Sequence, residues 1–313
     1  MRPVHGAANL LVIVEQATAR LQSSMNEKPY DGYQVALTAD FETAVEAILK
    51  QHAALICWNE PGVSPVTRRE DNGTCCFVST GDFRFVVTCA HVWEGFQNYL
   101  IKNGNGCLWV SLTLHPGANG PSIPYRIANP ILIDKNDGLD LATFTFEGIE
   151  KLESWRFYPY FRNSSQAISK GEGVFFLGYP GDEVRRATAI GVLGYTLFKF
   201  TVHDVSHRTF LLHDPPGARQ WVDAGGNRLP MQRIPGVSGS PVLRVARSSH
   251  GLLKIDLAGF VSGLLSPGIT NSDLEPVGME SSGSYEMSDG DIFITQARFL
   301  QLDGSIQERL ETM

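Results

Sequence analysis

Three short segments carry side chains that together could hydrolyse an acyl bond. His91 follows the apolar run Phe85-Val-Val and three small residues, a setting in which a general base lies at the edge of a core and stays reachable. Asp140 directly precedes the run Leu-Ala-Thr-Phe, so its carboxylate could turn inward and orient an imidazole. Ser238 lies between glycines, and glycine permits the tight turn that exposes a nucleophilic hydroxyl. The backbone N–H groups of Gly236 and Ser238 could then hold a developing oxyanion.

Each of these residues also has a plainer interpretation. The serine segment could be an ordinary Gly/Ser/Pro loop, and His91 could be a structural histidine at a strand end. Asp134 and Asp137 compete with Asp140 for the third role, although only Asp140 adjoins the apolar run. The chain order His, Asp, Ser favours catalysis, and it differs from the order in subtilisins and in α/β-hydrolases.

The elements that must position these residues are predicted to be helical first and then mainly β. Residues 40–50 place Phe41, Val45, Ile48 and Leu49 on one helical face, and residues 10–21 could form a second helix. Short β-branched or alternating runs separated by turn residues follow, with no regular helix between them, which favours barrels or a sandwich. The predicted strands are 75–79, 83–88, 107–114, 125–133, 139–146, 174–178, 188–202, 208–212, 241–245, 257–265 and 292–295.

The composition argues against nucleic acid and membrane as binding partners. The 313 residues carry a formal net charge of −7 and no dense basic block, so we expect no nucleic-acid partner. No apolar stretch is long enough for a membrane span or a signal peptide, so we expect no membrane partner. The five cysteines are odd in number and match no zinc spacing. We expect buried thiols and therefore a cytoplasmic location, with a disulfide as the open alternative.

The three segments together resemble the motifs of the chymotrypsin/trypsin-like serine proteases. Thr88-Cys-Ala-His91 is similar to the histidine motif of that family, Asp140-Leu-Ala to its aspartate motif, and Gly236-Val-Ser-Gly-Ser-Pro241 to its serine motif. Weaker similarities lie at 73–78, 178–181 and 259–263, and the segment 178–181 resembles one common in members of bacterial and organelle type. The resemblance covers roughly residues 70 to 300.

The resemblance implies two packed antiparallel six-stranded β-barrels with the catalytic triad between them. We expect a helical extension over residues 1–56, a first barrel over 57–165, and a second barrel with a C-terminal tail over 166–313. It also implies a serine endopeptidase that works through an acyl-enzyme and needs no cofactor and no metal. Its substrate would be a protein or a peptide.

The resemblance further implies a substrate-binding strand. Ser262 would lie beside the Asp–His pair, and Ser262, Gly263 and Leu264 would pair with bound peptide as an added strand. Gln232 lies where trypsin-like specificity requires an acid, so cleavage after Lys or Arg is not supported.

Two residues depart from the family pattern within the serine motif. Val237 stands where members activated by a new N-terminus carry an aspartate, so we expect no activation by that route. Ser240 replaces the commoner glycine, which weakens the motif.

Three alternatives stay open. The chain could be a protease-fold module that binds peptide without turnover. It could be an esterase of another fold that uses the later His250, although the helices of that fold are missing from the pattern. The helical extension could bind a regulatory partner, or it could simply complete the core.

Overall fold

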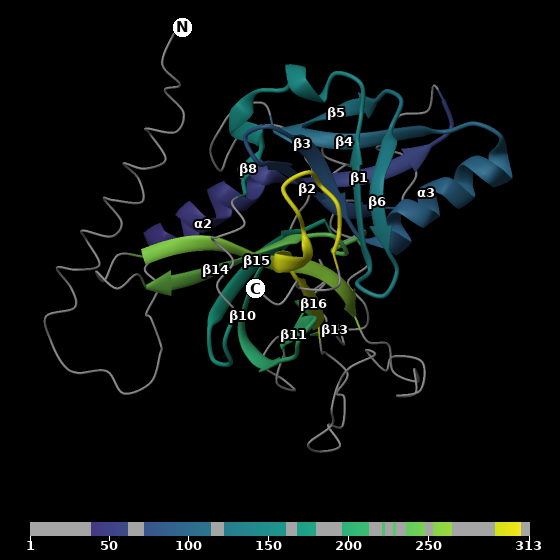
Figure 1. Cartoon of the computed structure of the whole chain (residues 1–313). Helices are drawn as coiled ribbons and strands as arrows, with labels where there is room; N and C mark the ends of the chain where they lie inside the picture. Colours follow the sequence, from purple (N-terminus) through teal and green to yellow (C-terminus); the bar gives the residue numbers. More distant parts are fainter. Residues whose placement is uncertain are drawn as a thin grey trace, which may run out of the picture.

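The computed structural model describes ten parts of the chain and contains two barrels packed against each other (Figure 1). The described residues are 39–61, 72–113, 122–160, 168–179, 196–212, 221–222, 228–229, 236–247, 253–264 and 292–307. Gln232, His250 and the predicted helix over 10–21 lie outside them. None of the helices in these parts has both the length and the apolar character needed to span a bilayer.

The first barrel is formed by a sheet whose two outermost strands, β5 and β6, follow each other directly in the sequence. The strand order is β5-β4-β1-β2-β3-β7-β6. Only residues 128–130 separate β5 from β6, and Asn129 adopts a positive φ of 47° between them. One bent strand therefore pairs with β4 at one end and with β7 at the other, which closes six strands into a barrel. The strands are β1 (Ala53–Asn59), β2 (Asn72–Ser79), β3 (Arg84–Thr88), β4 (Cys107–Thr113), β5 (Ser122–Ile127), β6 (Ile131–Asn136) and β7 (Leu141–Thr145).

The second barrel is a closed ring of six antiparallel strands in the order β10-β11-β16-β15-β14-β9. Three of its aromatic side chains, Phe176, Phe198 and Phe200, stack nearly parallel inside it. The mainly β class with two six-stranded barrels is therefore confirmed. The strands are β9 (Gly173–Gly178), β10 (Thr196–Val205), β11 (Thr209–Leu212), β14 (Pro241–Arg247), β15 (Leu253–Leu264) and β16 (Ile292–Gln296).

Smaller elements complete the described parts. The strand β8 (Tyr158–Pro159) runs parallel to β2, and β12 (Trp221–Val222) pairs with β13 (Arg228–Leu229). Three short 3₁₀ helices are η1 (Ile149–Lys151), η2 (Ser154–Arg156) and η4 (Ala297–Phe299).

Two α-helices of the described residues flank the barrels, and the sequence predicted one of them. Helix α2 (Ala39–His52) covers the predicted range. Helix α3 (Ala90–Asn103) was not predicted, because the segment around His91 was interpreted only as the end of an apolar strand. It buries Trp93 and Phe96 against the first barrel and ends at Gly104, whose φ of 72° stops the helix.

The expected boundary between extension and barrel needs correction. Strand β1 begins at Ala53 and crosses the boundary placed after residue 56. The run Ala-Ala-Leu-Ile-Cys-Trp-Asn is buried throughout, so it lacks the alternation that marks a half-exposed strand. Helix and strand therefore meet directly at His52 and Ala53.

A shared apolar core holds the two barrels together. Val45, Ile48 and Leu49 of α2 belong to one buried cluster with residues of both barrels. The segment after β16 returns to the first barrel, where the Thr143 hydroxyl donates to the Gly304 carbonyl at 2.6 Å and the Ile306 N–H donates to Asp134 Oδ2 at 2.7 Å. This crossing is the yellow loop in Figure 1.

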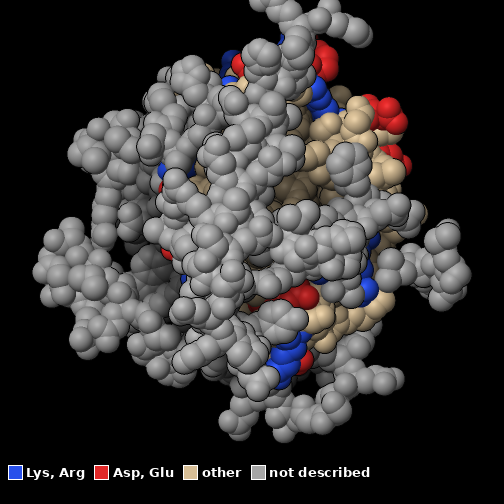
Figure 2. All heavy atoms as spheres, turned by 90° about the vertical axis from the view of Figure 1, so that its left-hand side faces the viewer, with Lys and Arg blue, Asp and Glu red and all other residues tan. Residues whose placement is uncertain are grey.

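Charges are mixed on the face seen in Figure 2. On the part of this face that the structure describes, Lys and Arg side chains lie interspersed with Asp and Glu, and no continuous basic surface is visible.

Candidate active site

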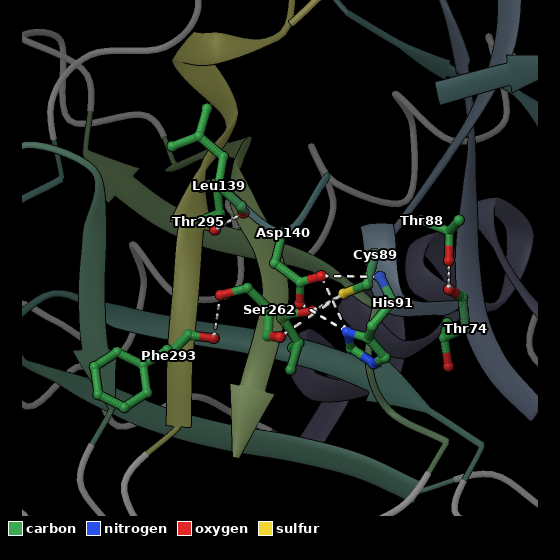
Figure 3. Close-up of polar contacts among 10 residues, drawn as sticks. Thr74, Thr88, Cys89, His91, Leu139, Asp140, Ser262, Phe293 and Thr295 are labelled. Atoms are coloured by element: carbon green, nitrogen blue, oxygen red, sulfur yellow. Dashed lines mark hydrogen bonds and ion pairs between the residues drawn. The ribbon is translucent and has the colours of Figure 1, made fainter. Parts of the chain in front are cut away.

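His91 and Asp140 meet at the edge of the first barrel (Figure 3). His91 Nδ1 lies 2.8 Å from Asp140 Oδ2 and 3.0 Å from Oδ1, and the His91 backbone N–H donates to Oδ1 at 3.1 Å. The carboxylate thus contacts both the ring and the main chain of the same histidine. This arrangement fixes the ring orientation and holds the proton on Nδ1, which leaves Nε2 as an acceptor.

The turn that carries Asp140 is held from both barrels. Asp140 has a φ of 49°, a left-handed conformation that aspartate tolerates better than most residues. The Leu139 N–H donates to Asn136 Oδ1 at 2.9 Å, and the Leu139 carbonyl accepts from the Thr295 hydroxyl of β16 at 2.7 Å. The second barrel therefore helps to place an aspartate of the first.

The other two aspartates have separate partners. Asp134 accepts hydrogen bonds from the backbone N–H groups of Lys135 and Ile306. Asp137 forms an ion pair with Lys135 at 2.9 Å. Of the three candidates, the structure brings only Asp140 to His91.

The environment of His91 favours its protonated form. Burial acts to lower its pKa, but the hydrogen bond and the charge of Asp140, together with the charge of Glu94, outweigh burial and raise the pKa above 6.5. Glu94 lies one helical turn after His91 on α3, and it contacts Lys135. The His91 side chain is 52% exposed and can reach a substrate.

Cys89 lies directly behind the His–Asp pair. Its side chain is fully buried, and Sγ lies 3.0 Å from the Val261 carbonyl of β15. Burial, and after it the charge and hydrogen bond of Asp140, raise the pKa of this thiol well above its ordinary value. All five cysteines are buried free thiols, but only Cys89 adjoins the candidate site.

The serine segment is anchored to the strands that lead to His91. The Thr74 N–H donates to the Ser238 carbonyl at 2.8 Å, and the Thr74 hydroxyl donates to the Gly236 carbonyl at 2.6 Å. The Gly239 N–H donates at 2.7 Å to the Val261 carbonyl, which also accepts from Cys89. Ser238 is thereby placed against Thr74 of β2, while Gly239 lies beside Thr88, the last residue of β3, three positions before His91. Among the described residues, no hydrogen bond joins the Ser238 hydroxyl to His91.

Glycine is required at both bends of the serine segment. Gly236 has a φ of 96°, and a Cβ there would lie 2.3 Å from the Tyr179 carbonyl oxygen. Gly239 has a φ of 88°, and its Cβ would lie 2.1 Å from the Thr74 carbonyl oxygen. Within the described parts of the chain, neither the Gly236 N–H nor the Ser238 N–H donates to a backbone carbonyl. The oxyanion-binding role expected for these two groups stays a prediction.

The two departures within the serine motif have structural reasons. Val237 is fully buried in the core of the second barrel, packed over Gly178, so this position has no charged group for a new N-terminus. The Ser240 hydroxyl donates to the Val237 carbonyl at 2.6 Å and the Ser240 N–H donates to the same atom at 3.0 Å. Serine at 240 therefore stabilises the turn.

The predicted substrate strand is the end of β15. Pairing between β14 and β15 stops at Phe260, whereas Gly263 and Leu264 still pair with β16 on the other side. The Ser262 hydroxyl donates to the Phe293 carbonyl at 3.2 Å and is directed to β16 rather than to Asp140. The Ser262 carbonyl lies 4.0 Å from Cys89 Sγ. The place of Ser262 beside the Asp–His pair and its part in binding a peptide stay predictions.

Sequence reasoning missed the threonines and the thiol that assemble this site. Thr88 donates to the Thr74 carbonyl at 2.9 Å, and Thr74 then holds the serine segment. Thr88 and Cys89 belong to the histidine motif, so the sequence indicated that they lie near His91. It did not indicate their hydrogen-bond partners, Thr74 and Val261, because these lie on other strands.

Comparisons with known proteins find distant structural similarity. No family model matches the chain, and no curated protein matches it. The chain is similar to the MamO protease domain from Magnetospirillum magneticum in its apo form, with 12% identity over 78% of this chain and 92% of that one and a TM-score of 0.40. It is also similar to Deg5, with 18% identity over 73% of this chain and 88% of that one and a TM-score of 0.42. The two-barrel architecture is assigned from the strand pairing of this chain.

Proposed function

We propose that this protein is a serine endopeptidase in which Ser238 attacks a peptide carbonyl, His91 transfers the proton and Asp140 orients His91. The observation that carries the proposal is the contact of the Asp140 carboxylate with both the ring and the backbone N–H of His91. This geometry leaves Nε2 free to accept a proton from a hydroxyl on the solvent side.

The chemistry follows in two steps. Ser238 Oγ bonds to the substrate carbonyl carbon while its proton moves to His91 Nε2, and the negative oxygen is held by the N–H groups of Gly236 and Ser238. His91 then gives the proton to the leaving amine, and an acyl-enzyme remains. Water, deprotonated by His91, releases the acyl group and restores Ser238.

A bound peptide would extend the second barrel. Within the described parts of the chain, β15 has no backbone hydrogen bond on its β14 side beyond Val261, which bonds to Gly239 and Ser240, so residues 262–264 can pair with an extended main chain. Main-chain pairing binds peptides without regard to most side chains, which suits a protein substrate.

The test is labelling of the full chain with a fluorophosphonate, which reacts with activated serines. We expect labelling of the wild type and its loss in Ser238→Ala and in His91→Ala. The matched controls are Ser305→Ala and His207→Ala, which replace a serine and a histidine outside the site and should still label. Labelling that persists in Ser238→Ala would show that another residue is the nucleophile.

A second candidate function is a protease-fold module that binds peptide without cleaving it. The lack of a hydrogen bond between the Ser238 hydroxyl and His91 favours it. This module would bind extended peptides equally well before and after Ser238→Ala and would not react with fluorophosphonate. Peptide hydrolysis that disappears in Ser238→Ala would exclude it.

A further inference from the structure

The thiol behind the triad gives this site a second set of possible ligands. Cys89 Sγ, a ring nitrogen of His91 and a carboxylate oxygen of Asp140 all lie within 4.8 Å of one another. Within the described parts of the chain, no other group of three or more His, Cys, Asp or Glu side chains is placed in this way. Thiolate, imidazole and carboxylate are together the ligands that Zn²⁺ and Cd²⁺ prefer, and Mg²⁺ and Ca²⁺ do not take thiolate.

We propose that Cys89, His91 and Asp140 form a binding site for a thiophilic divalent cation such as Zn²⁺, and that occupation of this site switches the triad off. Cation binding stands by itself, whereas the inhibition rests on the proposed peptidase function.

The geometry requires only small movements. Zinc binds sulfur at about 2.3 Å and nitrogen or oxygen at about 2.1 Å, so a tetrahedral ion separates its ligand atoms by roughly 3.3–3.7 Å. The ring nitrogen that faces Asp140 is Nδ1, at 2.8 Å from Oδ2. Sγ already lies within 4.8 Å of the other two ligand atoms, and on binding it would exchange its contact with the Val261 carbonyl for a bond to the ion.

Access and charge also fit a cation. His91 and Asp140 have side chains 52% and 26% exposed, which provides an entry path and room for a water as the fourth ligand. The buried thiol forms the floor of the site (Figure 3). One thiolate and one carboxylate balance the two positive charges of the ion.

The proton balance explains the inhibition. The Cys89 thiol releases its proton to solvent as sulfur bonds to the ion. The neutral His91 ring gives its Nδ1 lone pair to the ion, so its single proton moves to Nε2. A protonated Nε2 cannot accept the proton of Ser238, and the Asp140–His91 hydrogen bond is replaced by metal bonds. Removal of the ion by a chelator reverses every step.

The experiment titrates the chelator-treated, reduced full chain with Cd²⁺ and follows the ultraviolet charge-transfer absorption of cadmium–thiolate bonds. The test variants are Cys89→Ala and Cys89→Ser, the second of which keeps a polar group of similar size. The matched controls are Cys57→Ala and Cys107→Ala, which remove buried thiols elsewhere in the first barrel. We expect the band in the wild type and in both controls, and its loss in both Cys89 variants.

Fluorophosphonate labelling of the same samples, with Zn²⁺ or with chelator, measures the inhibition. For each variant, the labelling rate with Zn²⁺ is divided by the rate with chelator. A substitution that changes the rate without metal therefore does not affect the comparison. We expect Zn²⁺ to slow labelling of the wild type and Mg²⁺ to have no effect. Cys89→Ala should raise the Zn²⁺ concentration that gives half-inhibition at least about tenfold, because even the loss of a residue that only contacts a metal ligand lowers metal affinity by that factor.

The outcomes separate the two proposals. A cadmium–thiolate band that is absent from the wild type, or that persists in both Cys89 variants, would overturn the cation site. A band that depends on Cys89 in a chain that never labels would support the cation site and contradict the peptidase. Labelling that is equally sensitive to Zn²⁺ with and without Cys89 would also refute the site, because the ion would then act elsewhere.

Discussion

Protonation of His52 should destabilise the fold as the pH falls from about 6.5 to about 4. His52 ends α2, is only 5% exposed, and its Nδ1 lies 3.2 Å from the Arg156 carbonyl. Its ring packs edge-on against Tyr158 at 5.4 Å. Burial lowers its pKa from 6.5 to about 4, and the hydrogen bond to Arg156 only partly opposes this. Within the described parts of the chain, His52 forms no ion pair with a carboxylate, and burial disfavours the charged imidazolium, so the folded state keeps the ring neutral.

The magnitude follows from the two pKa values. Between pH 6.5 and about 4 the unfolded chain binds a proton at residue 52 and the folded chain does not, so acid favours unfolding. At about 1.4 kcal/mol per pH unit, the loss of stability reaches about 3 kcal/mol below pH 4. From pH 7 to pH 5 the same relation gives a loss of about 2 kcal/mol. Below the folded-state pKa both states are protonated and the loss is complete.

The assay is urea unfolding at pH 7 and pH 5, with the wild type compared with His52→Asn. Asparagine keeps an N–H donor near the position of Nδ1 but does not titrate. We expect the variant to lose about 2 kcal/mol less than the wild type between the two pH values. His207→Asn, at an exposed position, is the matched control. Equal pH dependence in wild type and His52→Asn would refute this reasoning, whatever the absolute stability of the variant.

Further predictions concern the site. Asp140→Asn should lower hydrolysis or labelling by about ten-thousand-fold with the fold intact by circular dichroism, because the amide stabilises the wrong His91 tautomer; a loss below tenfold would contradict the assigned role. Labelling of the wild type should rise with pH around a midpoint above 6.5, and Glu94→Gln should move that midpoint down, because the Glu94 charge raises the pKa of His91; an upward move would reverse the inferred sign. Gly239→Ala should cost more than about 2 kcal/mol in urea unfolding, since it combines a φ of 88° with a Cβ 2.1 Å from the Thr74 carbonyl oxygen; unchanged stability would mean that the turn differs.

The sequence predicted the strands whose side chains alternate or are β-branched, and it predicted the order of the three candidate catalytic residues. It did not predict α3, because Trp93 and Phe96 alone give too short an apolar pattern to separate a helix from a strand end. It did not show where the helical extension ends, since β1 is buried on both faces and continues the apolar pattern of α2.

The site was predictable in its residue types but not in its contacts. Choosing Asp140 over Asp134 and Asp137 rested on one apolar run, and the structure gives the physical reason: the other two carboxylates hold Ile306 and Lys135. The bonds from Thr74 to the serine segment and from Cys89 to Val261 cross more than 160 positions of the chain. Contacts between strands so far apart depend on how the barrels dock, which no local pattern of residues encodes.

Each barrel is packed against a segment that lies next to the other barrel in the sequence. Helix α2 precedes the first barrel and lies against β9 of the second, while residues 297–307 follow the second barrel and bond to Tyr160, Thr143 and Asp134 of the first. Each half therefore completes the core of the other. A chain cut between residues 160 and 168 should stay assembled as a two-fragment complex and regain its fold when the fragments are mixed. Heating the intact chain should accordingly give one calorimetric transition, because neither barrel keeps its core without its partner.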